Sequence, residues 1–570
     1  MKLAITSNLA FLLLFTDLPT SQIVYVGAIS VRATNPPPIV DLGYAQYQGR
    51  LVQDQVSNAT HTQFLGVRYA APPTGARRFG EPALPSFTSG VQQASAAAPT
   101  CLGGSQGHAP TTPFRNTGAG ENQMSLRSAG ELARERDQER QRRAADASPS
   151  EDCLFLNLWV PGVLGEKKNL PVVFFIHGGG YVEGSASALD GNDVLRESGE
   201  EAIAVLIQYR LGLFGFLPGQ KVKDGGALNA GLLDQQFALE WVQQHILKFG
   251  GDPQKVTIWG QSAGAGSVLQ QVIANGGETN PPLFRAAMTS STFLPSQYKF
   301  NDRIPETLYS EVVAQTNCSS AADTLDCLRN VDVDILETAN MVINNSGFFG
   351  TFVFVPVVDG TFITDRPTQL LKQGKVNGEI LFSNTNTFEG QTFVNQSTAD
   401  TVQVVDYVTQ LFPELGSKDI HAAAAQYAGL GTNIFQAVAI MGESIFICPT
   451  YYLLRGFGGA AFKSEFAIPP GTHASDVVYY FGNGATPPFA NPDFDKAFSE
   501  SFFNFALSLN VNSKWDKTDD APFWPLWTGS NEMLFNETEA GAPDVRVIKT
   551  SDALLKRCDF WESVSAATGQ

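Results

Sequence analysis

The stretch Val256-Thr257-Ile258-Trp259-Gly260-Gln261-Ser262-Ala263-Gly264 decides how the rest of the chain is interpreted. Its β-branched and aromatic residues predict a short strand over 256–259, and the small-residue segment 263–274 predicts a helix. Between them lies a Gly-x-Ser-x-Gly motif, whose small residues fit a sharp strand-to-helix turn. Such a turn raises the Ser262 hydroxyl above the sheet edge, where the positive end of the helix dipole faces it. The stretch therefore predicts a nucleophilic serine.

Apolar runs and helical patterns alternate on both sides of this stretch. Segment 231–249 carries apolar residues at helical spacing and predicts a helix. Further strands are predicted at 170–176, 203–209, 286–289 and 379–383. This alternation predicts an α/β fold, with a central, mostly parallel β-sheet flanked by helices in a single large domain.

The composition is that of a globular protein with a strong negative charge. Of the 570 residues, 43% are hydrophobic and 16% are charged, and the formal net charge is −18. This charge repels phosphate backbones and anionic lipid surfaces, so we expect no nucleic-acid partner.

The N-terminus resembles a secretory signal peptide. Lys2 precedes the apolar run 9–15, and small residues follow near Ala28 and Ala33. We assign residues 1–33 to this signal, with the cleavage site left open, and residues 34–570 to the folded domain. No later run approaches 18 apolar residues, so we expect no membrane span.

Cysteines and glycosylation sequons agree with export. The six cysteines are an even number, as expected for disulfide pairing in an oxidising compartment. The Asn-x-Ser/Thr sequons lie at Asn58, Asn317, Asn344, Asn395 and Asn536. We therefore expect a secreted, extracellular glycoprotein.

The loop between Cys101 and Cys153 carries a charged insertion. Gly, Ser, Thr and Pro dominate as far as Gly120, and the charged run 127–143 follows without a continuous apolar face. A solvated surface helix or a disordered loop is the favoured interpretation. A lid or docking element and a gene-model artefact remain open.

A serine nucleophile needs a general base, and a histidine serves best. In enzymes built around this turn, the chain order is serine, acid, histidine. Two histidines follow Ser262: His421, in a helix-like stretch, and His473, in a loop before the strand-like segment 477–480. A loop is where the base must lie, so we favour His473.

The acid that orients this histidine must lie between Ser262 and His473. Glu389 follows the predicted strand 379–383 through a short polar turn, which is where this class of fold places catalytic groups. Asp359 and Asp365 compete, although both are typical turn-formers beside Gly or Pro. Position alone does not choose among the three.

Attack by a serine on a carbonyl group also requires donors for the oxyanion that forms. The loop His177-Gly178-Gly179-Gly180-Tyr181 directly follows the predicted strand 170–176. Its glycines let backbone N–H groups approach an oxygen without side-chain obstruction. A plain glycine-rich turn is the alternative interpretation.

Taken together, these motifs resemble the type-B carboxylesterase/lipase family of α/β hydrolases, which includes cholinesterases and secreted fungal esterases. The resemblance runs from about residue 40 to Trp561. Its motifs are residues 64–73, 151–157, 178–180, 229–235, 249–253, 262–264, 356–360, 389–390, the segment around His473, and 557–561.

The resemblance implies roles for particular residues. It implies a triad of Ser262, Glu389 and His473, with oxyanion donors from the N–H groups of Gly179, Gly180 and Ala263. It also implies the disulfides Cys101–Cys153, Cys318–Cys327 and Cys448–Cys558. It further implies small-molecule or lipid ester substrates, with no cofactor and no metal.

Two departures narrow the expected function. Gln261 stands where cholinesterases carry an acidic residue, and the loop 101–153 contains no tryptophan, so a cation–π site for choline is missing. A lid rich in Arg and Glu would insert poorly into lipid, which weakens the lipase interpretation. We expect a secreted serine carboxylesterase that works through an acyl-enzyme. The alternatives are a triacylglycerol lipase and a non-catalytic adhesion or binding protein.

Overall fold

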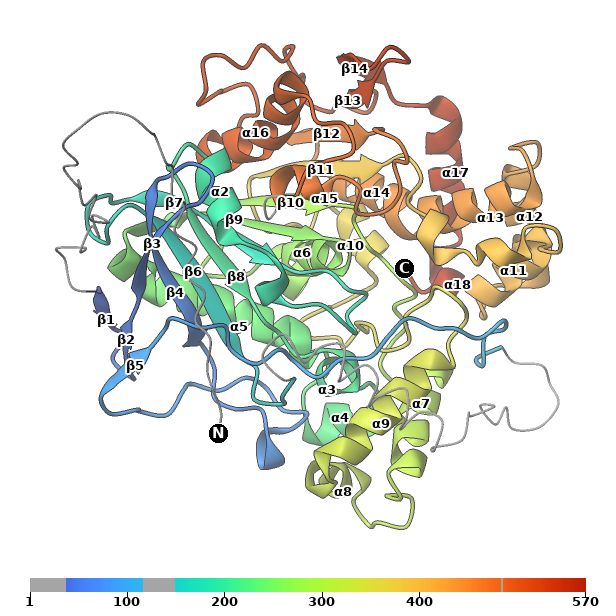
Figure 1. Ribbon diagram of the computed structural model, residues 1–570. Coiled ribbons are helices and arrows are strands. Elements are labelled where there is room, and N and C mark those ends of the chain that lie inside the picture. The colour runs from blue at the N-terminus through green and yellow to red at the C-terminus, as the bar shows by residue number, and fades with distance from the viewer. Residues whose placement is uncertain (1–36, 116–148, 483–484) are drawn as a thin grey trace, which may run out of the picture. The chain divides into compact units, whose positions relative to one another are not determined.

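The predicted strands lie side by side in one eleven-stranded sheet (Figure 1). From one edge to the other the strands are β14 (Pro543–Lys549), β13 (Asn531–Glu537), β12 (Ala461–Phe466), β11 (Ile380–Asn386), β10 (Ala286–Ser290), β9 (Gly251–Gln261), β7 (Leu170–Ile176), β8 (Ile203–Ile207), β6 (Phe155–Pro161), β4 (Thr60–Arg68) and β3 (Arg50–Gln53). The central strands from β8 to β13 are parallel, and antiparallel strands extend both edges. The prediction of a mostly parallel sheet is confirmed.

The computed structural model describes residues 37–115, 149–482 and 485–570. The predicted signal segment and the charged run 127–143 lie outside the described residues. Residues Pro38–Gln570 form one compact unit. A small sheet within it contains β1 (Ile39–Asp41), β2 (Gln46–Gln48) and β5 (Val91–Gln93).

Helices cover both faces of the large sheet. Helices α5 and α6 pack on one face, and α2 and α16 on the other. The helices in chain order are α2 (Gly191–Glu197), α3 (Gly212–Phe216), α4 (Gln220–Gly225), α5 (Ala230–His245), α6 (Ala263–Ile273), α7 (Arg303–Gln315), α8 (Thr324–Asn330), α9 (Val333–Asn345), α10 (Pro367–Lys372), α11 (Val404–Leu411), α12 (Ser417–Gln426), α13 (Asn433–Gly442), α14 (Cys448–Gly456), α15 (Val477–Tyr480), α16 (Pro492–Ser508), α17 (Asp552–Ser563) and α18 (Ser565–Thr568). Short 3₁₀ turns occur at Gly75–Arg77, Ala186–Ala188, Ile246–Phe249, Ala274–Gly277, Gln391–Phe393 and Gln396–Thr398.

The alternation of side chains along each strand separates two apolar cores. On β7, Val172 and Phe174 point into the core shared with α5 and α6. Val173 and Phe175 point into the core shared with α2 and α16. Because successive side chains of a strand face opposite ways, a strand buried on both sides must be apolar throughout. This is why β7 can be recognised in the sequence to the residue.

Two expectations are corrected by the structure. Segment 477–480, expected to be strand-like, is the short helix α15. Tyr479 and Tyr480 are both buried in the core that includes α16. Four residues are too few for their apolar pattern to distinguish a strand from a helix. Asn344 is fully buried on α9, where its amide donates to the Asn340 carbonyl at 2.8 Å. Its sequon is therefore not a surface glycosylation site.

Three disulfides join Cys101 to Cys153, Cys318 to Cys327, and Cys448 to Cys558. These are the pairs that the family resemblance implies. The last one ties α14 to α17. Within the described ranges, the helical segment Asn433–Gly456 is long and apolar enough to cross a membrane, but 89% of its most apolar window is buried. It is a core helix of the domain.

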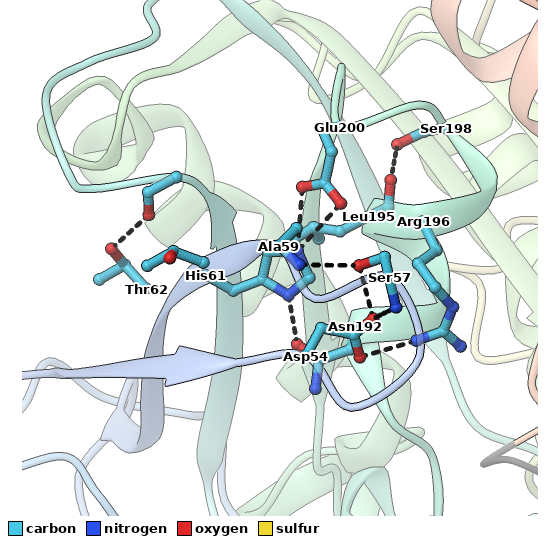
Figure 2. A network of polar contacts seen from close by, with 12 residues as sticks. Asp54, Ser57, Ala59, His61, Thr62, Asn192, Leu195, Arg196, Ser198 and Glu200 are labelled. Carbon is cyan, nitrogen blue, oxygen red and sulfur yellow. Dashed lines mark hydrogen bonds and ion pairs between the residues drawn. The ribbon is translucent and has the colours of Figure 1, made fainter. Parts of the chain in front are cut away.

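A buried cluster of hydrogen-bonded polar residues connects β4 to α2 (Figure 2). The His61 ring on β4 is fully buried, with Nδ1 2.8 Å from Asn192 Oδ1 and Nε2 3.0 Å from the Glu200 carboxylate. Arg196 on α2 donates to Asp54 Oδ1 at 2.9 Å. The cluster thus joins an antiparallel edge of the sheet to the helix that follows β7.

Candidate active site

The candidate nucleophile occupies a strained turn. Ser262 lies between β9 and α6 with φ 57° and ψ −124°, a conformation that few L-residues adopt. A Cβ at Gly260 would lie 2.2 Å from the backbone of Gly264, and one at Gly264 would lie 2.0 Å from the Ile176 carbonyl oxygen. The two glycines of the motif are required because backbone fills the space beside them. The sharp turn predicted from the sequence is present.

The glycine-rich loop after β7 lies against this turn. A Cβ at Gly178 would lie 3.0 Å from Ser262 Cβ. Gly179 and Gly180 have φ angles of 107° and 60°, so both need the conformational freedom of glycine. The loop therefore passes directly beside the serine.

His177 anchors the start of this loop. Its ring stacks on Tyr209 with centroids 4.5 Å apart, and the Tyr209 hydroxyl donates to the His177 carbonyl at 3.0 Å. The His177 Nδ1–H donates to the Gly178 carbonyl at 2.9 Å. Burial lowers the pKa of His177 to about 4, so the ring is neutral near pH 7. His177 thus holds the loop without adding a charge to the site.

The two predicted partners of the serine meet each other. His473, in the loop after β12, donates from Nδ1 to Glu389 Oε2 at 2.6 Å. Glu389 follows β11 and is fully buried. Parallel strands end at the same edge of a sheet, so β9, β11 and β12 deliver Ser262, Glu389 and His473 to one place.

The other oxygen of the Glu389 carboxylate is also satisfied. Oε1 accepts hydrogen bonds from the Ser291 hydroxyl and from the Asn386 backbone N–H, each at 2.7 Å. The Asn386 side chain donates at 3.0 Å to Asp476, a second fully buried carboxyl. Burial raises the pKa of Asp476, and hydrogen bonds from Asn386 and Tyr480 oppose the rise.

These supporting residues were not predicted from the sequence. Ser291 and Asn386 reach Glu389 only because β10 and β11 pair in parallel register, which short segments do not reveal. The signal that could have found Asp476 is its position three residues after His473, where a carboxyl returns to the same network.

The competing candidates lie elsewhere. His421 is exposed on α12 and donates from Nδ1 to the Ser417 carbonyl at 2.8 Å. Asp359 accepts the N–H groups of Thr361 and Phe362 and closes a turn. Asp365 is exposed. In the ranges that the structure describes, no three His, Cys, Asp or Glu side chains are placed to hold a metal ion.

A mainly apolar pocket, called the cavity below, lies beside the site. The Phe352 ring forms part of its wall and occupies the space that a Cβ at Gly180 would need. Phe293, also in the wall, contacts Phe446, whose ring centroid is 4.6 Å from that of His473. The cavity therefore adjoins both the glycine-rich loop and the histidine.

Comparison with known proteins identifies the family of this chain. The sequence profile of the carboxylesterase family matches residues 36–561. The chain belongs to the carboxylesterase family. As a member, it is a carboxylic ester hydrolase with the α/β-hydrolase fold.

Several proteins similar to this chain come from fungi. Carboxylesterase patB of Aspergillus clavatus is 31% identical, over 92% of this chain and 96% of the relative. Lipase 4 of Diutina rugosa is 31% identical, over 84% and 88%. The secreted triacylglycerol lipase LIP1 of Gibberella zeae is 29% identical, over 83% of each. The crystal structure of Aspergillus niger EstA matches with a TM-score of 0.77 and 28% identity, covering 94% of this chain and 99% of that one.

Proposed function

We propose that the chain is a secreted serine carboxylesterase in which Ser262, His473 and Glu389 form the catalytic triad. The observation that carries the proposal is the 2.6 Å hydrogen bond from His473 to Glu389, at the sheet edge where the strained Ser262 turn lies. A buried carboxylate on Nδ1 fixes the tautomer in which Nε2 can accept a proton.

The reaction proceeds through an acyl-enzyme. Ser262 Oγ attacks the ester carbonyl carbon as its proton passes to His473 Nε2, and the carbonyl π electrons move onto the oxygen. The N–H groups of Gly179, Gly180 and Ala263 donate to this oxyanion, and each such donor contributes roughly 3–4 kcal/mol. Collapse breaks the C–O bond to the alcohol, which leaves with the proton from His473. Water then attacks the acyl-enzyme by the same steps.

Glu389 stabilises the imidazolium that forms in each half of this cycle. Its carboxylate is fully buried and accepts hydrogen bonds from Ser291 and Asn386. These bonds orient the carboxylate toward His473.

The cavity beside the site favours esters with a sizeable apolar group. Its walls are mostly aromatic and aliphatic, and polar side chains are few among them. A bound alkyl chain gains about 0.8 kcal/mol for each methylene that it buries. We infer that the cavity receives one apolar arm of the ester.

Secretion is supported by several features. The three disulfides need an oxidising compartment, and one relative is named a secreted lipase. We propose that residues 1–33 are removed and that residues 34–570 form the mature domain. Among the remaining sequons Asn58 and Asn317 are exposed. Asn395 and Asn536 are half-buried.

Hydrolysis of p-nitrophenyl esters from acetate to palmitate tests the proposal, with Ser262→Ala as the matched variant. We expect the wild-type protein to cleave these esters and the variant to lose at least a thousandfold in kcat. Equal inactivity of both proteins would contradict the proposal and favour the non-catalytic binding protein.

A triacylglycerol lipase is the second candidate, because several relatives carry lipase names. Thr112 and Phe114, in the described part of the 101–153 loop, line the cavity. A lipase would show a sharp rise in rate once tributyrin exceeds its solubility limit. An esterase would show saturation below that limit.

A further inference from the structure

A second pocket lies along one face of α5 and is called the α5 pocket below. Its residues on α5 follow the i, i+3, i+4, i+7, i+8 spacing of one helix face; they are Phe237, Glu240, Trp241, Gln244 and His245. The rest of its wall comes from the turn between β1 and β2, the residue after β4 and the loop that leads to β5. None of its residues lines the cavity beside Ser262, and α5 ends before β9 begins, whereas Ser262 follows the end of β9. The α5 pocket is therefore separate from the candidate active site.

Hydrogen bonds within the fold hold the aromatic side chains of the α5 pocket. The Trp241 Nε1–H donates to the Tyr44 hydroxyl at 3.0 Å, and that hydroxyl donates to the Arg68 carbonyl. The Tyr69 hydroxyl donates to the Gln208 carbonyl at 2.7 Å. Because the donors of these rings are already used, the rings contribute mainly aromatic surface to the pocket.

Glu240 supplies a charge to this aromatic surface. Burial raises the pKa of the Glu240 carboxyl, and within the part of the chain that the structure describes its carboxylate has no hydrogen bond or ion pair to oppose the rise. His245 adds no charge near pH 7, because burial and the charge of Lys248 lower its pKa. Among the described residues that line the pocket, Glu240 is thus the only one that carries a full charge.

The cations near the α5 pocket already have acidic partners of their own. Lys248 donates to the Asp41 carbonyl at 2.6 Å and interacts electrostatically with the Asp41 carboxylate. Arg68 donates to both oxygens of Asp152, at 2.6 and 2.8 Å. Glu240 therefore leaves an unmatched negative charge beside an apolar, aromatic wall.

We propose that the α5 pocket binds a small organic cation, in which an ammonium group is attached to a flat apolar body. The ammonium group would pair with the Glu240 carboxylate. The apolar body would pack against Tyr44 and Phe237, which are half-buried and leave part of each ring open. Aromatic faces also attract cations directly. A neutral ligand would shield Glu240 from water without giving it a partner, which is unfavourable. This binding site is independent of the proposed esterase function.

The test compares the binding of 2-phenylethylammonium with that of the neutral 2-phenylethanol, measured by saturation-transfer NMR at pH 8. The two probes share the same ring and differ in the charged group. We expect the ammonium to bind at least tenfold more tightly than the alcohol. Equal affinities, or no binding of the ammonium, would overturn the proposal without the need for any variant.

Variants then locate the bound cation. Glu240→Gln keeps the shape of the side chain and removes its charge, so we expect the affinity for the ammonium to fall at least tenfold. Glu539→Gln is the matched control, because it removes the same charge from an exposed carboxylate elsewhere, and it should leave the affinity within twofold. Equal affinities in the two variants would overturn the proposal. Ser262→Ala should bind the ammonium as the wild type does, and a loss there would place the cation in the candidate active site instead.

Discussion

At the scale of single residues, the site depends on how Glu389 is held. Its buried carboxylate has one oxygen on His473 and the other on Ser291 and Asn386. A hydrogen bond to a charged group contributes about 1.5–3 kcal/mol, so each partner should matter to the imidazolium formed during turnover.

Ser291→Ala removes the hydroxyl donor to Glu389. We expect kcat to fall by roughly 10- to 100-fold, the equivalent of about 1.5–3 kcal/mol, with little change in KM. Thr292→Val is the matched control, since the Thr292 hydroxyl bonds to Thr289 at 3.0 Å. Steady-state kinetics with a short ester measures both, and equal losses in the two variants would contradict the assignment.

The turn around Ser262 should tolerate no side chain at Gly264. A Cβ there would lie 2.0 Å from the Ile176 carbonyl, whereas a Cβ at Gly416 has no atom within 4 Å. We expect Gly264→Ala to lower the free energy of unfolding by about 1–3 kcal/mol or more, as overpacking of a core usually does. Gly416→Ala should change it little. Urea unfolding followed by tryptophan fluorescence compares the two, and similar midpoints would count against the described turn.

At the scale of elements, the buried contacts between β4 and α2 should make the stability of the fold depend on pH. Burial alone would lower the pKa of His61, but its hydrogen bonds to Glu200 and Asn192 and the charge of Glu200 raise the pKa above its ordinary value (Figure 2). The protonated ring therefore stabilises the fold. That contribution is full below the unfolded pKa of about 6.5 and is lost as pH rises through the raised folded value.

We accordingly expect His61→Gln to destabilise the protein more at pH 5.5 than at pH 9. Urea unfolding at both values measures the difference. Glu200→Gln should flatten the dependence, since it removes the carboxylate that raises the pKa of His61. A pH-independent loss in His61→Gln would show that the ring is neutral in the folded protein.

The burial of each strand explains whether the sequence could predict it. β7 and β10 are buried on both faces, so continuous apolar runs marked them nearly to the residue. β12 carries the buried polar residues Lys463 and Ser464, which pair with neighbouring strands, and it was missed. The antiparallel strand β14 lies at an edge and has no buried residue, so its apolar signal is weak.

At the scale of the whole molecule, seven parallel strands deliver distant residues to one edge of the sheet. The Gly-x-Ser-x-Gly motif predicted Ser262, and a loop position favoured His473 over His421. Only the family resemblance selected Glu389 from the competing carboxylates. The cavity was not predictable, because its walls come from segments as far apart as Phe114 and Met441 that meet only in the folded chain.

Filling this cavity should change substrate preference. Val355→Trp places a large ring in the wall, so we expect kcat/KM for p-nitrophenyl octanoate to fall at least tenfold while that for the acetate stays within twofold. The loss corresponds to a few methylenes left unburied at about 0.8 kcal/mol each. Ile335→Trp, at an exposed position on α9, is the control. Equal losses on both esters would mean that the cavity holds no part of the substrate.

The central claim is that Ser262 carries the acyl group during turnover. Incubation with diethyl p-nitrophenyl phosphate, followed by peptide mass spectrometry, tests it most directly. The account predicts one diethylphosphoryl adduct per chain, on the peptide that contains Ser262, and none on Ser262→Ala. An unmodified Ser262 in an active enzyme, or an adduct on another residue, would contradict it.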